Sequence, residues 1–253
     1  MPISERSCAV VTGASSGIGA AFAAELAAQG HYVVLIARRT ERLAEVLGAL
    51  PEGAGESLVL DVAAPGSAEA ALAHLAQRGL IPDLLINNAG IGDYRPLLDA
   101  DLERLHAMIE VNSRALLDWT YAFLLGMRER RRGAVIQVAS GIVFVPAPKM
   151  ATYAASKAFV HALGEALPFE LQGTGVSYLT LYPGSTESEF FVGAGMSRPP
   201  GTVPARQVAR EGLAALARGK TRHVVGAFNR FGTRIMPFLP RGFVARMAAR
   251  MTQ

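Results

Sequence analysis

Short apolar runs alternate with longer helix-like segments along most of this chain. Each run is apolar along its whole length, which is typical of strands covered by helices on both faces. The helix-like segments connect successive runs, as the right-handed crossovers between parallel strands require. The predicted strands are 8–13, 32–37, 57–61, 83–90, 133–140, 177–184 and 222–226, and the predicted helices are 17–29, 40–49, 67–78, about 101–129, 153–172 and 204–218. We therefore expect an α/β fold, a doubly wound parallel sheet of about seven strands flanked by helices.

One segment breaks this alternation. Residues 185–203 follow the sixth predicted strand and are rich in Gly, Pro, Ser and Thr. No repeat or low-complexity linker separates two cores, so we interpret the segment as a lid over a substrate site and not as a domain boundary. The chain is predicted to form a single domain over residues 1–253, with a C-terminal extension at about 228–253.

The composition indicates a cytoplasmic protein with much hidden surface. Of its 253 residues, 51 % are hydrophobic and only 18 % are charged, below the roughly 25 % usual for soluble proteins. We therefore expect an oligomer. The single cysteine, Cys8, lies in an apolar run, which favours a buried, inert thiol and a reducing compartment. There is no signal-like leader and no apolar stretch of membrane-spanning length.

The formal net charge is +4, but the basic residues are scattered along the chain. One run, "RERRR" at 128–132, ends a predicted helix, where cations favour the negative helix terminus. We interpret it as a solvated helix end, and a polyanion site is the alternative. Nucleic acid is not expected as a partner. The histidines do not cluster at ligand spacings, so no metal is expected either.

A glycine-rich turn, "TGASSGIG" at 12–19, follows the first strand and opens the first helix. Gly13, Gly17 and Gly19 permit a tight turn, a close approach of the backbone to a pyrophosphate, and close packing of helix on strand. The helix N-terminus then offers free N–H groups and a positive dipole end to phosphate. This position in the strand–helix order indicates dinucleotide binding.

These residues carry a family resemblance. The TGxxxGxG spacing, together with "NNAG" (87–90), Ser140 and the YxxxK pattern of "YAASK" (153–157), resembles the short-chain dehydrogenases/reductases over about residues 7–190. The resemblance implies a Rossmann-like fold and nicotinamide chemistry. In relatives the helices corresponding to 101–129 and 153–172 form the main subunit contact, so a homodimer or homotetramer is expected.

Tyr153 and Lys157 stack on one face of a helix, because residues i and i+4 are neighbours there. We expect the ammonium to lie near the phenol and to lower its pKa toward neutral pH. Tyr153 can then give a proton to a carbonyl oxygen or take one from an alcohol. By itself such a spacing is more often an accidental surface pair, but Ser140 at the carboxyl end of the fifth strand changes that interpretation.

The resemblance completes the catalytic set. Asn112, in "VNS" (111–113), matches the family's asparagine that supports a water relaying protons to the lysine; the alternative is a polar residue that bends its helix. Lys157 is also implied to hold the nicotinamide ribose. The predicted catalytic residues are Asn112, Ser140, Tyr153 and Lys157.

The second strand indicates which cofactor binds. It ends in Ala37, Arg38 and Arg39, where NAD-preferring relatives carry an acid. A guanidinium pairs with the 2′-phosphate of NADP(H), so NADP(H) is the predicted cofactor. Asp61 and Val62 resemble the family's adenine contact, although Asp61 also suits a turn cap. The predicted cofactor-binding residues are Gly13, Ser15, Ser16, Gly17, Ile18, Gly19, Arg38, Arg39, Asp61, Val62, Asn88, Ala89, Gly90, Tyr153, Lys157, Pro183, Gly184 and Thr186.

The sequence therefore predicts an NADPH-dependent oxidoreductase that transfers hydride reversibly between nicotinamide and an apolar carbonyl compound or secondary alcohol. Two alternatives stay open: a reductase of 3-oxoacyl thioesters, and an NADP(H)-sensing binding protein without turnover.

The C-terminal extension contains an apolar helical stripe: Phe243, Val244, Met247, Ala248 and Met251. It is interpreted as a cover within the molecule or between subunits, and peripheral membrane contact is the alternative.

Overall fold

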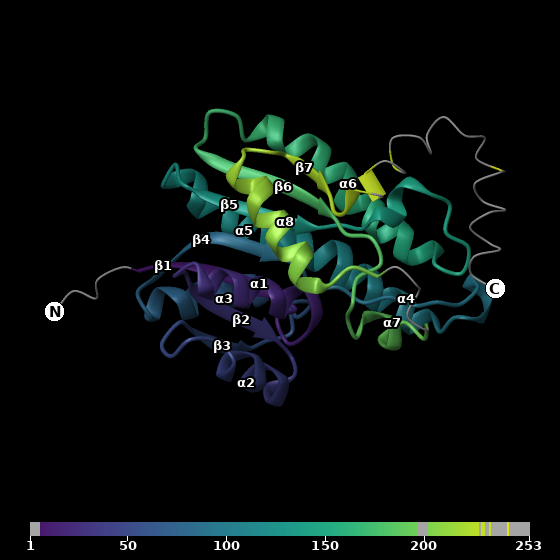
Figure 1. The fold of residues 1–253 in the computed structure, drawn as a ribbon, viewed down its shortest axis with the longest axis horizontal. Coiled ribbons are helices and arrows are strands. Elements are labelled where there is room, and N and C mark those ends of the chain that lie inside the picture. The colour runs from purple at the N-terminus through teal and green to yellow at the C-terminus, as the bar shows by residue number, and fades with distance from the viewer. Residues whose placement is uncertain (1–5, 197–201, 228, 231–232, 234–241, 243–253) are drawn as a thin grey trace.

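The computed structural model describes residues 6–196, 202–227, 229–230, 233 and 242. Within these residues, seven strands form one parallel sheet in the order β3-β2-β1-β4-β5-β6-β7 (Figure 1). The strands are β1 (Arg6–Thr12), β2 (Tyr32–Ala37), β3 (Gly55–Val59), β4 (Leu80–Asn87), β5 (Gly133–Val138), β6 (Val176–Tyr182) and β7 (Arg222–Val224). The predicted doubly wound parallel sheet is confirmed. Successive strands are added on one side of β1 up to β3 and on its other side from β4 onward. The point between β1 and β4 is where ligands bind in open α/β sheets.

Helices cover both faces of the sheet. They are α1 (Gly17–Ala28), α2 (Thr40–Gly48), α3 (Ser67–Gln77), α4 (Leu102–Ile109), α5 (Leu116–Glu129), α6 (Ala151–Glu170), α7 (Phe190–Gly193) and α8 (Ala205–Ala217). Successive residues of β1 enter different cores, as the two-residue period of a strand requires. Val11 packs in a core with Phe22 of α1 and Val208 of α8, whereas Val10 packs with Leu75 of α3 and Trp119 of α5. Both faces of the sheet are therefore buried under helices, which explains why the strands are apolar along their whole length.

The observed elements differ from the predicted ones at their ends. The predicted strand 83–90 stops at Asn87, because the next residues leave the sheet to bind the glycine-rich turn. The predicted helix 101–129 is interrupted: a π-helical turn, Glu110–Ala115, separates α4 from α5. Asn112 lies inside that turn. The proton relay and the bend in the helix both stay predictions for this residue.

The predicted lid, 185–203, contains short regular elements within the described residues. Thr186 forms a parallel β-bridge with Val203, and α7 follows at Phe190–Gly193. Residues 197–201 of this segment lie outside the described residues. The predicted apolar stripe of the C-terminal extension also lies outside them.

Three arginines of the 128–132 run, Arg130, Arg131 and Arg132, contact other parts of the chain. Arg132 pairs with Asp83 at 2.5 Å, and Arg130 and Arg131 donate to the backbone carbonyls of Pro82 and Gly173. These contacts lie just beyond the end of α5, which supports the helix-end interpretation.

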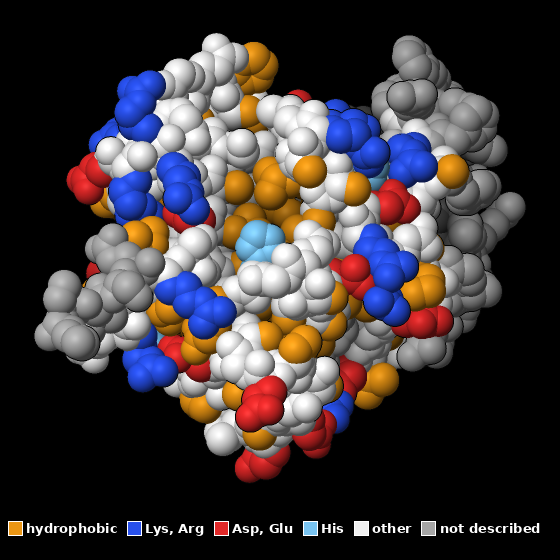
Figure 2. All heavy atoms as spheres, turned by 60° about the vertical axis from the view of Figure 1, so that its left-hand side comes forward, with side chains coloured by type: hydrophobic (Ala, Val, Ile, Leu, Met, Phe, Trp, Pro, Cys, Tyr) orange, Lys and Arg blue, Asp and Glu red, His pale blue; other side chains and the backbone are white. Residues whose placement is uncertain are grey.

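The charge of the protein is mixed on the face drawn in Figure 2. Hydrophobic side chains gather near the centre of that face, with Lys, Arg, Asp and Glu side chains around them. The small net positive charge is therefore not collected into one basic patch there. Among the described residues, no helix is both long and apolar enough to span a membrane.

Candidate active site

The glycine-rich turn connects β1 to α1 and leaves no room for a side chain at Gly13 or Gly19. Gly13 has a φ of +63°, and a Cβ there would lie 2.9 Å from the Cα of Ala89. A Cβ on Gly19 would lie 2.3 Å from the carbonyl oxygen of Gly13. The first turn of α1 therefore packs directly on the preceding turn, which only glycine permits. This close packing places the free N–H groups of the helix at the carboxyl edge of the sheet.

The segment after β4 locks this turn in place. Thr12 Oγ1 accepts hydrogen bonds from the backbone N–H groups of Asn88 and Ala89, at 2.9 and 3.0 Å. The side-chain nitrogen of Asn88 donates to the carbonyl oxygen of Thr12 at 2.9 Å. Asn88 therefore positions the glycine-rich turn. A cofactor contact by Asn88, Ala89 or Gly90 stays a prediction.

Two arginines follow β2 and have different partners. Arg39 Nη2 donates to the hydroxyls of Ser15 and Ser16, both at 3.0 Å. Arg38 pairs instead with Asp61 at 3.6 Å and is largely exposed. The structure therefore places Arg39, and not Arg38, directly against the glycine-rich turn.

An open hollow of about 370 Å³ lies beside these groups. Its lining comprises Ser15, Ser16, Gly17, Arg42, Glu45, Val46, Glu187, Ser188 and Glu189. Hydroxyls, a helix N-terminus and the Arg42 guanidinium line a space open to solvent, together with the carboxylates of Glu45, Glu187 and Glu189. The donors among these groups suit the phosphates of a dinucleotide. Sequence reasoning missed Arg42 and Glu189, because neither belongs to a motif.

Asp61 and Val62 make contacts within the protein. Asp61 Oδ1 accepts from the backbone N–H of Ala63 at 3.0 Å, so the turn-cap alternative is observed. The Val62 carbonyl accepts from Ser67 Oγ and from Trp119 Nε1. An adenine contact for Asp61 and Val62 stays a prediction.

Ser140 and Tyr153 form the centre of the site. Ser140 follows β5, and its hydroxyl accepts from the backbone N–H of Ile142. Tyr153, near the start of α6, is buried and forms a side-chain hydrogen bond with Ser140. The two hydroxyls therefore lie next to each other, at the carboxyl edge of the sheet.

Burial decides the protonation of Tyr153. Loss of water around the phenol raises its pKa to about 12, and the hydrogen bond with Ser140 opposes that rise only in part. The predicted lowering of the Tyr153 pKa by Lys157 is therefore wrong for this structure. Loss of water is the largest cause, and the Lys157 ammonium donates to the carbonyl oxygen of Val138, at 2.8 Å.

Lys157 and Asn112 meet at the backbone of Gly90. A Cβ on Gly90 would lie 3.2 Å from Asn112 Oδ1 and 3.5 Å from Lys157 Nζ. Asn112 Oδ1 accepts from the N–H of Ile91 at 2.9 Å, while its Nδ2 donates to Ser156 Oγ at 3.0 Å. The π-helical turn thus aims Asn112 at the segment after β4. The four predicted catalytic residues surround the carboxyl ends of β4 and β5, and the water relay stays a prediction.

Burial lowers the pKa of Lys157 from 10.5 to about 8. Between these values the unfolded chain keeps a proton on this lysine that the native protein has lost, so stability increases with pH there. In Lys157→Met the increase is absent. Between pH 8 and 10.5, the free energy of unfolding of the wild type should rise by about 3 kcal/mol relative to that of Lys157→Met, at about 1.36 kcal/mol per pH unit. Urea unfolding at several pH values measures it, and parallel curves for the two proteins would contradict it.

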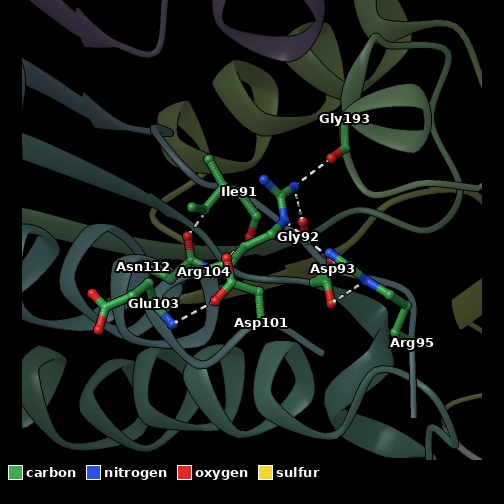
Figure 3. A network of polar contacts seen from close by, with 9 residues as sticks. All are labelled: Ile91, Gly92, Asp93, Arg95, Asp101, Glu103, Arg104, Asn112 and Gly193. Carbon is green, nitrogen blue, oxygen red and sulfur yellow. Dashed lines mark hydrogen bonds and ion pairs between the residues drawn. The ribbon is translucent and has the colours of Figure 1, made fainter. Parts of the chain in front are cut away.

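A second polar network lies next to this site and was missed by sequence reasoning (Figure 3). Asp93 is buried and pairs with Arg95 at 2.6 Å and with Arg104 of α4 at 3.0 Å. Arg104 also donates to the backbone carbonyls of Gly92 and Gly193. One guanidinium therefore ties the segment after β4 to the end of α7.

Apolar side chains pack around Tyr153. The Phe190 ring lies 5.1 Å from the Tyr153 ring, centroid to centroid, and packs against Gly92. The apolar side chains grouped with Tyr153 are Ile91, Ala100, Leu105, Met108, Ile142, Met150 and Phe190.

The segment after β6 lies against the loop that carries Ser140. The carbonyl of Pro183 accepts from the backbone N–H of Gly141, the residue after Ser140, at 2.8 Å. Thr186 Oγ1 donates to the carbonyl of Gly184. The segment 183–186 therefore lies beside the loop that carries Ser140. A contact of Pro183, Gly184 and Thr186 with a cofactor stays a prediction.

Comparison with known proteins supports this geometry. The family model described as short chain dehydrogenase matches residues 7–196. A short chain dehydrogenase of Pseudocercospora fijiensis is 40 % identical over 186 residues, covering 72 % of this chain and 60 % of that protein. A very-long-chain 3-oxoacyl-CoA reductase of Anas platyrhynchos is 35 % identical over 181 residues, covering 69 % of this chain and 58 % of that protein. The matched region thus spans less than two thirds of these two relatives.

A solved short-chain dehydrogenase from Sphingobium yanoikuyae, in complex with NADPH, superposes with a TM-score of 0.81 at 27 % identity. The alignment covers 93 % of this chain and 97 % of that one. Solved structures similar to this chain hold NADPH or NAD. The family match, covering well over half of the sequence, shows that this chain belongs to the short-chain dehydrogenase/reductase family of oxidoreductases.

Proposed function

We propose that this chain is an NADP(H)-dependent reductase of apolar carbonyl compounds, reversible as an alcohol dehydrogenase. The observation that carries the proposal is the hydrogen bond between Ser140 and Tyr153 inside an apolar wall. Two hydroxyls that converge in a site shielded from water suit a carbonyl oxygen that gains negative charge during reduction.

Tyr153 is the proposed proton donor. Because its pKa is raised to about 12, the phenol is protonated at neutral pH, which is the form needed to reduce a carbonyl. Ser140 donates a hydrogen bond to the same carbonyl oxygen and orients it. When bound, the nicotinamide cofactor supplies the hydride for reduction or accepts one in the reverse direction.

Lys157 and Asn112 support the proton transfer. With a pKa near 8, Lys157 can lose and regain a proton close to neutral pH. Asn112 faces the same Gly90 backbone and would hold a water that connects the lysine to solvent. Lys157 would also hold the ribose of the cofactor, next to Gly90.

The arginines after β2 support NADP(H) as the cofactor. Replacing Arg39 with Ala should raise the dissociation constant for NADPH by about tenfold to hundredfold, the loss expected for hydrogen bonds to a charged group. The constant for NADH should change far less, since NADH lacks the 2′-phosphate. Arg38→Ala should also weaken NADPH more than NADH. Fluorescence titration measures both constants, and equal losses for the two cofactors would contradict a phosphate-binding role.

The substrate class follows from the wall around Tyr153. Its aliphatic and aromatic side chains favour an apolar carbonyl compound. The similar 3-oxoacyl-CoA reductase keeps the thioester alternative open, whereas the converging catalytic groups argue against a binding protein without turnover. The test incubates purified protein and NADPH with ketones, aldehydes and 3-oxoacyl thioesters and follows loss of NADPH absorbance. No turnover with any of them, despite tight NADPH binding, would favour the sensor.

We also propose that the chain forms a homodimer or homotetramer. Large apolar side chains lie exposed on two helices, namely Leu117, Tyr121 and Leu125 on α5, and Phe159 and Phe169 on α6. Burial of such side chains in a subunit contact is favourable, which supports the proposal. Analytical ultracentrifugation tests it.

A further inference from the structure

A carboxylate from the predicted lid occupies the arginines beside the glycine-rich turn. Glu189, the residue before α7, accepts a hydrogen bond from Arg39 Nη1 at 2.7 Å through Oε2. Its other oxygen, Oε1, accepts from Arg42 Nη2. These ion pairs lower the pKa of Glu189, with the Arg39 hydrogen bond as the largest cause. Glu189 is therefore ionised and held between two guanidinium groups.

These guanidinium groups line the site proposed for the 2′-phosphate. Arg39 also donates to Ser15 and Ser16 of the glycine-rich turn, and Arg42 and Glu189 line the hollow beside it. A guanidinium pairs with a carboxylate or a phosphate through the same planar set of N–H donors. The two anions therefore compete for the same donors.

The lid segment that carries Glu189 also reaches the catalytic tyrosine. Its next residue, Phe190, packs its ring against the Tyr153 ring. The carbonyl of Gly193 accepts from Arg104 (Figure 3). The carbonyl of Ala194 accepts from the N–H of Tyr94 at 2.8 Å. One short segment thus connects the proposed phosphate site to the substrate side of the active site.

We propose that Glu189 determines cofactor discrimination: its carboxylate competes with the 2′-phosphate of NADP(H) for Arg39 and Arg42. This inference rests on the proposed NADP(H) dependence. A ligand with a 2′-phosphate must displace Glu189, and the displacement frees the start of α7 from the glycine-rich turn. A ligand without that phosphate leaves Glu189 in place. The apparent affinity for NADP(H) is therefore reduced by the fraction of molecules in which Glu189 holds the arginines.

The test compares Glu189→Gln with the wild type by calorimetric titration. The probes are adenosine 2′,5′-bisphosphate, which carries the 2′-phosphate, and 5′-AMP, which does not. Gln keeps the shape of Glu but removes the charge, so Glu189→Gln should bind the bisphosphate roughly threefold to tenfold more tightly at low salt, as expected for partly exposed ion pairs. Its affinity for 5′-AMP should stay within about twofold.

Glu187→Gln is the matched control. Glu187 lies on the same segment and borders the same hollow, but its side chain is exposed and forms none of the arginine contacts given for Glu189. This variant loses the same charge and should change the affinity for the bisphosphate by less than about twofold. Equal gains in both variants would show a general charge effect and overturn competition by Glu189.

The outcomes separate this inference from the proposed function. If the wild type binds the bisphosphate no better than 5′-AMP, the proposed NADP(H) dependence fails, and the inference fails with it. If the wild type prefers the bisphosphate and Glu189→Gln leaves that preference unchanged, only the inference is overturned. Hydrogen exchange gives a second readout: the bisphosphate, in contrast to 5′-AMP, should speed exchange at the amides of Gly193 and Ala194, which bond to Glu189 and Phe190. Equal exchange with both probes would also overturn it.

Discussion

Tyr153→Phe is expected to lower kcat for carbonyl reduction by about 10³- to 10⁴-fold, at the upper end of the range for general acid–base catalysis. The variant loses the hydroxyl that hydrogen-bonds with Ser140 but keeps the ring that packs against Phe190. The fold and the glycine-rich turn should therefore be unchanged, and the dissociation constant for NADPH should rise by no more than about tenfold, the loss of one neutral hydrogen bond. Steady-state kinetics and NADPH titration measure the two effects separately.

Tyr121→Phe is the matched control for this prediction. Tyr121 lies on the face of α5 proposed as a subunit contact and is 65 % exposed in the single chain. Phe keeps the ring for that contact, so loss of the hydroxyl should leave kcat unchanged within about twofold. If Tyr153→Phe keeps more than about a tenth of the wild-type kcat, the proton comes from another group, and the proposed mechanism is wrong.

Gly19→Ala should lower both stability and cofactor affinity. The added Cβ would lie 2.3 Å from the carbonyl oxygen of Gly13 and 2.7 Å from Asn88 Nδ2. Because one of these contacts is with backbone, the glycine-rich turn must move, and overpacking of this kind costs about 1–3 kcal/mol. The turn then no longer offers its N–H groups in the native geometry, so NADPH affinity should fall by about tenfold to hundredfold. Urea unfolding and NADPH titration measure the two losses.

Gly48→Ala controls for the substitution itself. Gly48 ends α2, and a Cβ there meets no atom within 4 Å. Since alanine is the better helix former, the free energy of unfolding should stay the same or rise, by up to about 1 kcal/mol. NADPH affinity should not change. Equal losses in both variants would contradict the packing argument at Gly19.

The sheet and the positions of the motifs follow from local sequence. Uniformly apolar runs separated by helix-length segments leave a parallel sheet covered on both faces as the consistent fold, and the structure has that sheet. Gly13 and Gly19 were predicted to allow close packing, and a Cβ at either position would indeed make contacts that are too short. Local patterns were informative here because strand burial and turn conformation depend on residues close together in sequence.

The chemistry of Tyr153 could not be predicted from spacing alone. Helical geometry places Lys157 on the same face as Tyr153, but it does not determine how much water reaches either side chain. Burial raises the pKa of the phenol, and the ammonium donates to Val138 of a neighbouring strand. Both effects depend on what the rest of the chain packs around α6.

By itself, the sequence determined the strand pattern, the glycine-rich turn and the identity of the residues that converge on the site. Tertiary structure alone decided which groups form hydrogen bonds or ion pairs with one another. Asn112 reaches Ile91 through a π-helical turn, and Glu189 reaches Arg39 although 150 residues separate them in sequence. Such partners depend on which distant segments meet in the folded chain, and a local sequence pattern does not show which segments meet.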